Sequence, residues 1–148
     1  MKPSQKLEKL LRDIIDADLE NWTGAGALTV ETDIDAPDIT RPFVHVVAGD
    51  GEEHEVLRGV YTGDVIATIE ANANETTAAN IKSWAGSLHH LLGNIPTLRG
   101  LLNTDPRPVE DFHAFDVRTS EPQTQRNDST WLVSVTLRVV YMGADKSG

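Results

Sequence analysis

One long alternating pattern near the C-terminus constrains the fold more than any other feature of the sequence. Between Trp131 and Tyr141 every second residue is a large apolar one, and Ser134, Thr136 and Arg138 lie between them. Side chains of a β-strand point alternately to its two faces, so a period of two predicts a strand with one buried face. An isolated strand pair is only marginally stable. The chain must therefore build a larger sheet and cover one of its faces.

Helical and further strand patterns supply the remaining elements. Leucine and isoleucine at three- and four-residue spacing predict a helix over residues 5–22, with Ser4 as its N-cap. Two strands that should form an antiparallel hairpin are predicted over residues 43–48 and 56–71, with Leu57 on the inward side. Later elements are a helix from residue 75 capped by Thr76 or Thr77, a short helix over 97–102, and a strand over 111–118. Trp22, Trp84 and Trp131 each occupy a core-facing position.

This order predicts an α+β fold: a mostly antiparallel four-stranded sheet with helices packed on one face, in the order α-β-β-α-α-β-β. The 148 residues suit a single domain over residues 1–148. Residues 27–41 read as an Asp-rich loop in which residues 28–30 could form a short strand. The polar segment 119–129 predicts a mobile hairpin loop, and residues 143–148 a loose C-terminus.

The charge is acidic and unevenly distributed. The chain has 23 acidic and 13 basic residues, a net charge of −10. Residues 13–81 hold 15 acids against Arg41 and Arg58, which leaves −13 in that segment. This balance argues against binding to DNA or to an anionic membrane, because both require clustered bases. Two interpretations of the acidic segment stay open: a solvated face, or a negative surface with a function.

No motif in the sequence indicates catalysis. There is no cysteine, no nucleophile elbow, no zinc-binding HExxH and no phosphate-binding glycine loop. His89 and His90 are adjacent on a helix and point about 100° apart, so they do not form a metal-binding pair. His54 lies among glutamates in a solvated turn, and His113 is about 7 Å from Asp111 along a strand, too far for a direct hydrogen bond. We expect neither an enzyme nor a cofactor or metal site.

A well-formed hydrophobic core, exposed strand edges and polar loops without catalytic motifs are typical of a subunit of a larger assembly. The N-terminus lacks an apolar signal sequence and no apolar run reaches membrane-spanning length, so an intracellular protein is expected. We place its contacts in two polar hairpin turns. The residues assigned to them are Asp50, Glu52, Glu53, Glu55, Gln125, Arg126, Asn127 and Asp128.

Four segments together resemble a known family. They are the amphipathic helix 5–22, the proline-led strand 42–47, the segment 94–102 (NIPTLRGLL) and the closing strand 131–141 (WLVSVTLRVVY). In this order, in an acidic chain of this length, they resemble the tail terminator (tail completion) proteins of long-tailed bacteriophages, of the lambda type. The resemblance covers most of the chain, and the Asn-Ile-Pro segment followed by an apolar helix is its most distinctive part.

The resemblance implies a ring, a hexamer, that docks on the completed tail tube, stops further addition of tube subunits and presents a surface for head attachment. Implied partners are further copies of the chain, the major tail tube protein and a head-completion or connector protein. DNA would pass through the ring without specific binding, and an acidic lumen would repel it. The implied location is the head-proximal end of the tail in the virion, after assembly in the host cytoplasm. The alternatives are another head-tail joining protein, such as a head-completion or stopper ring, and an unrelated α+β ligand-binding domain or enzyme.

Overall fold

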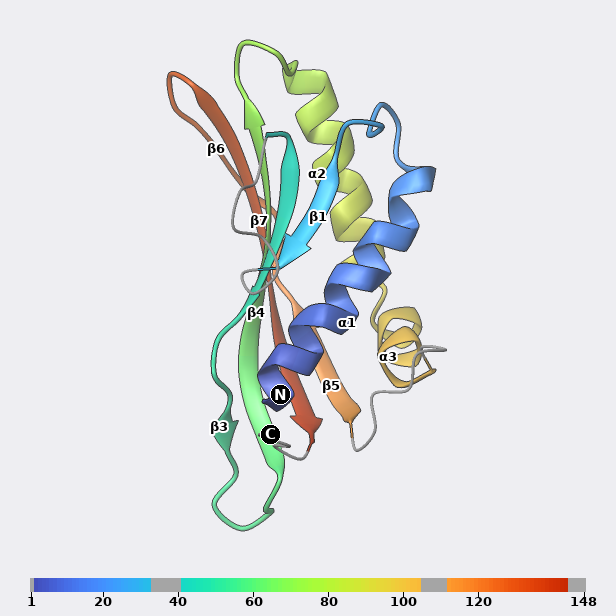
Figure 1. The fold of residues 1–148 in the computed structure, drawn as a ribbon. Helices are drawn as coiled ribbons and strands as arrows, with labels where there is room; N and C mark the ends of the chain where they lie inside the picture. The colour runs from blue at the N-terminus through green and yellow to red at the C-terminus, as the bar shows by residue number, and fades with distance from the viewer. Residues whose placement is uncertain (1, 33–40, 105–111, 144–148) are drawn as a thin grey trace.

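The computed structural model describes residues 2–32, 41–104 and 112–143, and it has one sheet with helices packed on one face (Figure 1). The α+β class is therefore confirmed. The elements are α1 (Pro3–Asp18), the 3-10 helix η1 (Leu19–Asn21), β1 (Thr29–Thr32), β2 (Phe43–Ala48), β3 (Glu52–Glu53), β4 (Val60–Asn72), α2 (Ala78–Gly93), α3 (Ile95–Thr104), β5 (His113–Thr119), β6 (Gln123–Arg126) and β7 (Thr130–Met142).

Two long strands form the centre of the sheet. β4 and β7 pair antiparallel over their whole length, from Val60 opposite Met142 to Asn72 opposite Thr130. The sheet order is β1-β2-β4-β7-β5, with β3 also paired to β4 and β6 also paired to β7. The predicted hairpin of β2 and β4 is confirmed as an antiparallel pair. The short strands β2 and β3 thus pair along the outer edge of β4, and β5 and β6 pair along the outer edge of β7.

The sheet is larger and less regular than the four antiparallel strands predicted. Across the described ranges it has seven strands, and β1 runs parallel to β2. The additional strands β3 and β6 lie within segments expected to be a turn and a hairpin loop. Their side chains are exposed and polar, and they join the sheet through backbone pairing with β4 and β7. Such pairing leaves no hydrophobic period in the sequence, which is why pattern reasoning omitted it.

The core lies between the sheet and the helices, as the alternation in residues 131–141 predicted. Its largest fully buried side chains are Leu7, Leu11, Ile15, Val44, Val46, Ile69, Ile81, Leu88, Leu92, Leu98, Leu137 and Tyr141. Trp22 and Trp84 are buried as expected, whereas Trp131 is half-buried at the start of β7. Each indole N–H donates a hydrogen bond, to Asp18 Oδ2 at 2.8 Å, to the Thr23 carbonyl at 3.1 Å and to the Thr76 carbonyl at 3.2 Å respectively.

Helix starts follow local chemistry, with one correction. Thr77 caps α2, and its hydroxyl accepts a hydrogen bond from the Asn80 amide at 3.2 Å, as predicted. The predicted N-cap of α1 is wrong, because Lys2 is the cap and Ser4 is buried inside the first turn. Pro3 explains the earlier start, since its fixed φ and missing N–H suit the first helical turn.

The described residues test the predicted loops only in part. The predicted strand over residues 56–71 begins only at Val60, so Val56 and Leu57 precede it. The optional strand at 28–30 is confirmed in part by β1, which begins at Thr29, while residues 33–40 of the Asp-rich loop lie outside the described residues. Gly143 is the last residue described, so the predicted loose C-terminus lies almost wholly beyond them.

Candidate interaction surfaces

The polar residues predicted to make contacts fall into two groups at opposite ends of the sheet (Figure 1). One group follows β2 and surrounds β3, beside the first residues of β4. The other lies on β6 and in the β6–β7 turn, beside the last residues of β4. At about 3.3 Å per residue, the length of β4 separates them by roughly 40 Å. The structure therefore does not bring the two groups together; it offers two separate surfaces.

In the group at the β6–β7 turn, Asn127 and Arg126 contact neighbouring residues and stabilise the turn. Asn127 Oδ1 accepts hydrogen bonds from the backbone amides of Ser129 at 3.0 Å and Thr130 at 2.8 Å. The Arg126 guanidinium lies 5.2 Å from the centre of the Trp131 ring, a cation-π contact that shields the half-buried indole. Asn127 and Arg126 thus have structural roles. Gln125 and Asp128 are exposed.

The group at β3 is more open. Glu53 Oε2 accepts the Gly59 amide at 3.4 Å, and its Oε1 accepts the Arg58 guanidinium at 3.3 Å. The hydrogen bond from Gly59, followed by those from Tyr61 and Arg58, lowers the pKa of the Glu53 carboxyl. Glu53 therefore holds the hairpin closed, and Asp50 lies 3.6 Å from Lys2 Nζ.

Glu52 and Glu55 of the same group are exposed, and among the described residues neither side chain makes a hydrogen bond or an ion pair. They lie beside a hollow of about 300 Å³ formed by Glu52, Glu53, His54, Glu55, Val56 and Thr62. Two carboxylates at the end of the sheet are thus available to a partner.

Sequence reasoning missed the apolar tip of the β3–β4 loop, which consists of Val56 and Leu57. These side chains are 80% and 56% exposed, the highest values among the large hydrophobic residues of the described ranges. A strand that began at residue 56 would place Leu57 on the same face as Tyr61 and Val65. β4 begins only at Val60, so Leu57 lies in the loop before it. The signal was present in the sequence, because Val56 and Leu57 are adjacent apolar residues between charged ones and do not alternate.

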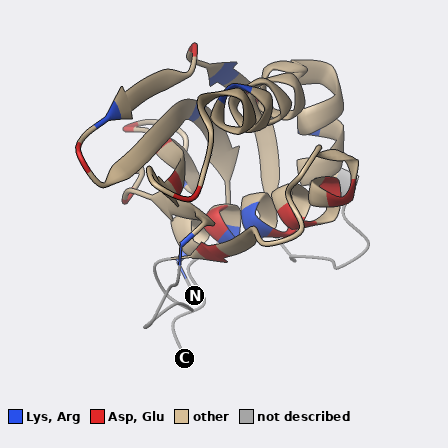
Figure 2. Cartoon of the chain, turned by 90° about the horizontal axis from the view of Figure 1, so that it is seen from above, with Lys and Arg blue, Asp and Glu red and all other residues tan. Residues whose placement is uncertain are grey.

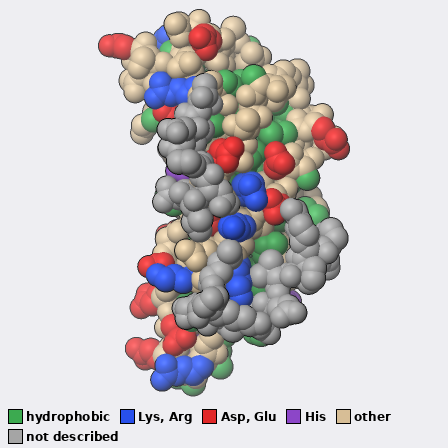
Figure 3. All heavy atoms as spheres, viewed as in Figure 1, with side chains coloured by type: hydrophobic (Ala, Val, Ile, Leu, Met, Phe, Trp, Pro, Cys, Tyr) green, Lys and Arg blue, Asp and Glu red, His purple; other side chains and the backbone are tan. Residues whose placement is uncertain are grey.

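The face of the sheet without helices carries balanced charge. Arg138 Nε lies 3.1 Å from Asp64 Oδ1 across the central ladder, and Arg41 Nη2 lies 2.6 Å from Glu70 Oε1. Ile66 on the same face is 43% exposed. On the side of the molecule seen in Figure 3, which has the view of Figure 1 and is not the helix-free face, acidic and basic side chains are also interspersed, and both kinds occur along α1 in Figure 2. The acids of residues 13–81 that the structure describes are therefore spread over several elements and form no single surface.

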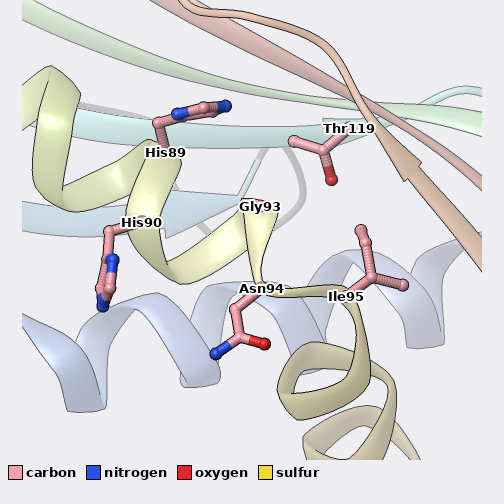
Figure 4. A pocket seen from close by; sticks show the side chains of 6 residues that line it. All are labelled: His89, His90, Gly93, Asn94, Ile95 and Thr119. Carbon is pink, nitrogen blue, oxygen red and sulfur yellow. The ribbon is translucent and has the colours of Figure 1, made fainter.

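A hollow of about 430 Å³ lies between α2, α3 and β5 (Figure 4). Figure 4 shows His89 and His90 pointing in different directions from α2, which confirms the predicted divergence of the pair. His89 Nε2 lies 3.8 Å from the exposed Glu121 carboxylate, and the Thr119 hydroxyl donates to the Leu92 carbonyl at 2.7 Å. The residues lining the hollow are His89, His90, Gly93, Asn94, Ile95 and Thr119.

The residues considered for acid-base chemistry lie only partly within the described ranges. His113 is exposed and contacts Phe115 edge-on, with ring centres 4.8 Å apart. Asp116 lies 3.6 Å from Arg118, while Asp111 is outside the described residues. Searching the described residues for three or more clustered His, Cys, Asp or Glu side chains finds no group that could hold a metal. Of the helices described, none is both long enough and apolar enough to cross a membrane.

Comparison with known proteins identifies the fold. No protein-family profile and no curated protein matches the sequence. Among solved structures, the chain is similar to one in the structure described as "Virion of native gene transfer agent (GTA) particle", with a TM-score of 0.53. The match covers 90% of this chain and 95% of that chain at 12% sequence identity. The two chains therefore share a fold over nearly their whole lengths.

Proposed function

We propose that this chain is a structural protein of a phage-type virion and, within that class, a tail terminator. In this role a ring of six copies caps the tail tube, ends its polymerisation and forms the interface for head-tail joining. The observation that carries the proposal is the shared fold with a chain of a gene transfer agent virion, over 90% of one chain and 95% of the other. The four segments that resemble tail terminator proteins support the same assignment.

The proposed mechanism is capping by shape and charge, and no bond is made or broken. A cap needs separate surfaces for the tube, for the head side and for its own copies. The two ends of the long β4–β7 ladder provide separate surfaces roughly 40 Å apart, which can therefore contact different partners. The proposed partners are the major tail tube protein and a head-completion or connector protein. The proposed location is the head-proximal end of the tail.

DNA passes through such a ring, and the chain's charge suits passage without binding. The net charge of −10 opposes contact with phosphate, and Arg41 and Arg138 on the helix-free face are paired with Glu70 and Asp64. Reversing exposed acids outside the β3 hairpin, such as Asp16 and Glu20, to Lys tests this point. If an acidic lumen matters, DNA retention by purified virions should rise, and unchanged retention would argue against the charge having this role.

Deletion of the gene from its virus or element tests the proposal. We expect heads without tails, and tubes longer than those of the parent, because tube growth has lost its stop. Complementation with the wild-type chain should restore the normal length. Tubes of normal length that fail to join heads would assign the chain to the other class of head-tail joining proteins. Normal particles in the deletion would overturn both assignments.

A further inference from the structure

The apolar tip of the β3–β4 loop is exposed but is held in a defined shape. His54 Nδ1 accepts hydrogen bonds from the backbone amides of Val56 at 3.2 Å and Leu57 at 3.1 Å. The His54 amide in turn donates to the Val60 carbonyl at 2.8 Å. A preformed loop loses less conformational entropy on binding than a flexible one. Val56 and Leu57 are therefore presented as a ready-made apolar contact and not as a frayed end.

The surroundings of this tip are strongly negative. Residues 50–58 contain four carboxylates, of which Glu53 and Asp50 contact Arg58 and Lys2, and the remaining two are exposed. A partner for the tip must offer a hollow bordered by positive or neutral groups, because like charges across an interface are costly.

The helices α2 and α3 offer this complement within the same sequence. Residues 76–104 contain no acidic residue in a chain with net charge −10, and they include Lys82 and Arg99. The hollow lies at the junction of the two helices (Figure 4), and its lining is mostly polar, with Ile95 as its apolar side chain. Arg99 is four residues after Ile95 on α3 and therefore lies on the same side of that helix. The one acid at the border is Glu121, which is exposed beside His89.

The two surfaces lie on different sides of one molecule. β3 pairs with β4 on the side of that strand occupied by β2, whereas α3 packs on β5 at the opposite edge of the sheet. Figure 1 shows the β3–β4 hairpin at the lower left and α3 at the right. A chain does not fill its own hollow with its own tip. A contact between two different surfaces of identical subunits repeats head to tail, and closes a ring when the rotation allows.

We propose that the apolar tip of one copy docks in the hollow between α2, α3 and β5 of a second copy. Val56 and Leu57 enter the hollow, and the acidic flanks of the loop lie against the acid-free surface of the two helices. This inference rests on the proposed function, for which it supplies the contact between neighbouring subunits. The charge complementarity also makes the contact weaken as salt rises.

Cysteine crosslinking tests the contact directly, because the chain has no cysteine of its own. Leu57→Cys and Asn94→Cys variants, mixed in equal amounts and oxidised, should give a dimer on non-reducing gels. Either variant alone should give none, and neither should a mixture of Ile66→Cys with Asn94→Cys. A chain carrying both Leu57→Cys and Asn94→Cys should give a ladder that ends at the ring size. Absence of the mixed dimer at high protein concentration would overturn the proposal.

Sedimentation of surface variants provides a second test with matched controls. The double variant Val56→Ser, Leu57→Ser and the single variant Arg99→Glu should each associate roughly tenfold more weakly or worse, because buried interface anchors dominate affinity. Ile66→Ser and Arg118→Glu change the same chemistry elsewhere and should associate like the wild type. Mixing the tip variant with Arg99→Glu should give dimers and nothing larger, since one intact contact remains per pair.

The outcomes separate this contact from the proposed function. A tip variant that keeps full self-association would refute the contact, and the deletion phenotype of long tubes would still support a terminator. A wild-type chain that does not associate, together with cysteine variants that do not crosslink, would also refute the contact. Restored association only between tip-intact and hollow-intact copies would support it. Circular dichroism of each variant checks that the exposed substitutions leave the fold intact.

Discussion

The two faces of the β4–β7 ladder differ although they belong to the same two strands. On the face toward the helices, Val65, Ile69 and Val135 are fully buried. On the other face, Asp64 pairs with Arg138, and the Thr68 hydroxyl lies 3.4 Å from the Ser134 hydroxyl. The faces alternate residue by residue, so one backbone ladder supports two surfaces of different chemistry.

This difference shows which face contributes most of the free energy of folding and which face tolerates substitutions. Removing apolar side chains from water is the main stabilising contribution, and it acts mainly on the helix-facing side. The other face contributes less to folding and, together with the exposed loops at the two ends of the ladder, is open to partners. The following predictions test this division, from the largest expected effect to the smallest.

Truncation on the helix-facing side should cost the most. Leu137 is 1% exposed opposite Val65, and Leu137→Ala should lower the free energy of unfolding by about 2–5 kcal/mol because it leaves a cavity. Thr136→Ala, on the neighbouring residue but the other face, should change it by about 0.5 kcal/mol or less. Urea denaturation followed by tryptophan fluorescence measures both. Equal losses for the two variants would contradict the division between the faces.

The end of the ladder beside Gly51 and Tyr141 is tightly packed, so a larger side chain there should destabilise the protein. A methyl group on Gly51 would lie 2.5 Å from Tyr141 Oη and 3.0 Å from Tyr61 Cβ. Gly51→Ala should therefore lower stability by about 1–3 kcal/mol, the usual cost of overpacking. Gly49→Ala is the matched control, because the nearest atom to its methyl would be 3.9 Å away, and it should be nearly neutral. Tyr141→Phe in the Gly51→Ala background should restore part of the loss.

The Tyr141 phenol should give the ladder a pH-dependent stability. Burial, followed by the charges of Tyr61 and Asp50, raises the pKa of Tyr141 from 10.0 to about 12. Between these values the unfolded phenol has lost its proton and the folded one retains it, so stability should fall as pH rises from 10 toward 12. Ultraviolet titration and denaturation at several pH values measure this. The fall should be shallower in Tyr141→Phe, and an identical profile would contradict the assignment.

The ion pair on the helix-free face should matter least. The Asp64 and Arg138 side chains are 49% and 64% exposed, and exposed pairs contribute at most about 1 kcal/mol. Asp64→Asn should change the free energy of unfolding by about 0.5 kcal/mol or less at moderate salt. A double-mutant cycle with Arg138→Gln isolates the pair. A coupling energy as large as the Leu137→Ala effect would show that this face also holds the fold together.

The regular spacing of apolar side chains predicted the helices and strands that bury one face. The alternation after Trp131, the leucine stripe of α1 and the Thr77 cap of α2 were all confirmed, because each depends on neighbours close in sequence. The same local rule failed where the feature was not periodic. β3 and β6 carry polar side chains and form because a long strand beside them offers unpaired backbone groups.

The candidate surfaces were predicted only in part. The acidic residues near Glu52 do lie at an open end of the sheet, but Asn127 and Arg126 serve the turn that contains them. The alternating pattern predicts an inward position for Leu57, although Leu57 lies in a loop. The pattern shows which residues of a strand share a face but not where the strand begins. The hollow beside His89 combines two helices and a strand distant in sequence, and no local pattern indicates it.

The sequence by itself determined an α+β chain with one strongly apolar face per element, an acidic surface and no thiol chemistry. These properties follow from residue type and short-range spacing. The tertiary structure decided which polar segments joined the sheet, which loop presents Val56 and Leu57, and that this loop and the acid-free helices lie on different sides of the molecule. Those features depend on backbone pairing and packing between segments far apart in the chain, which side-chain period does not encode.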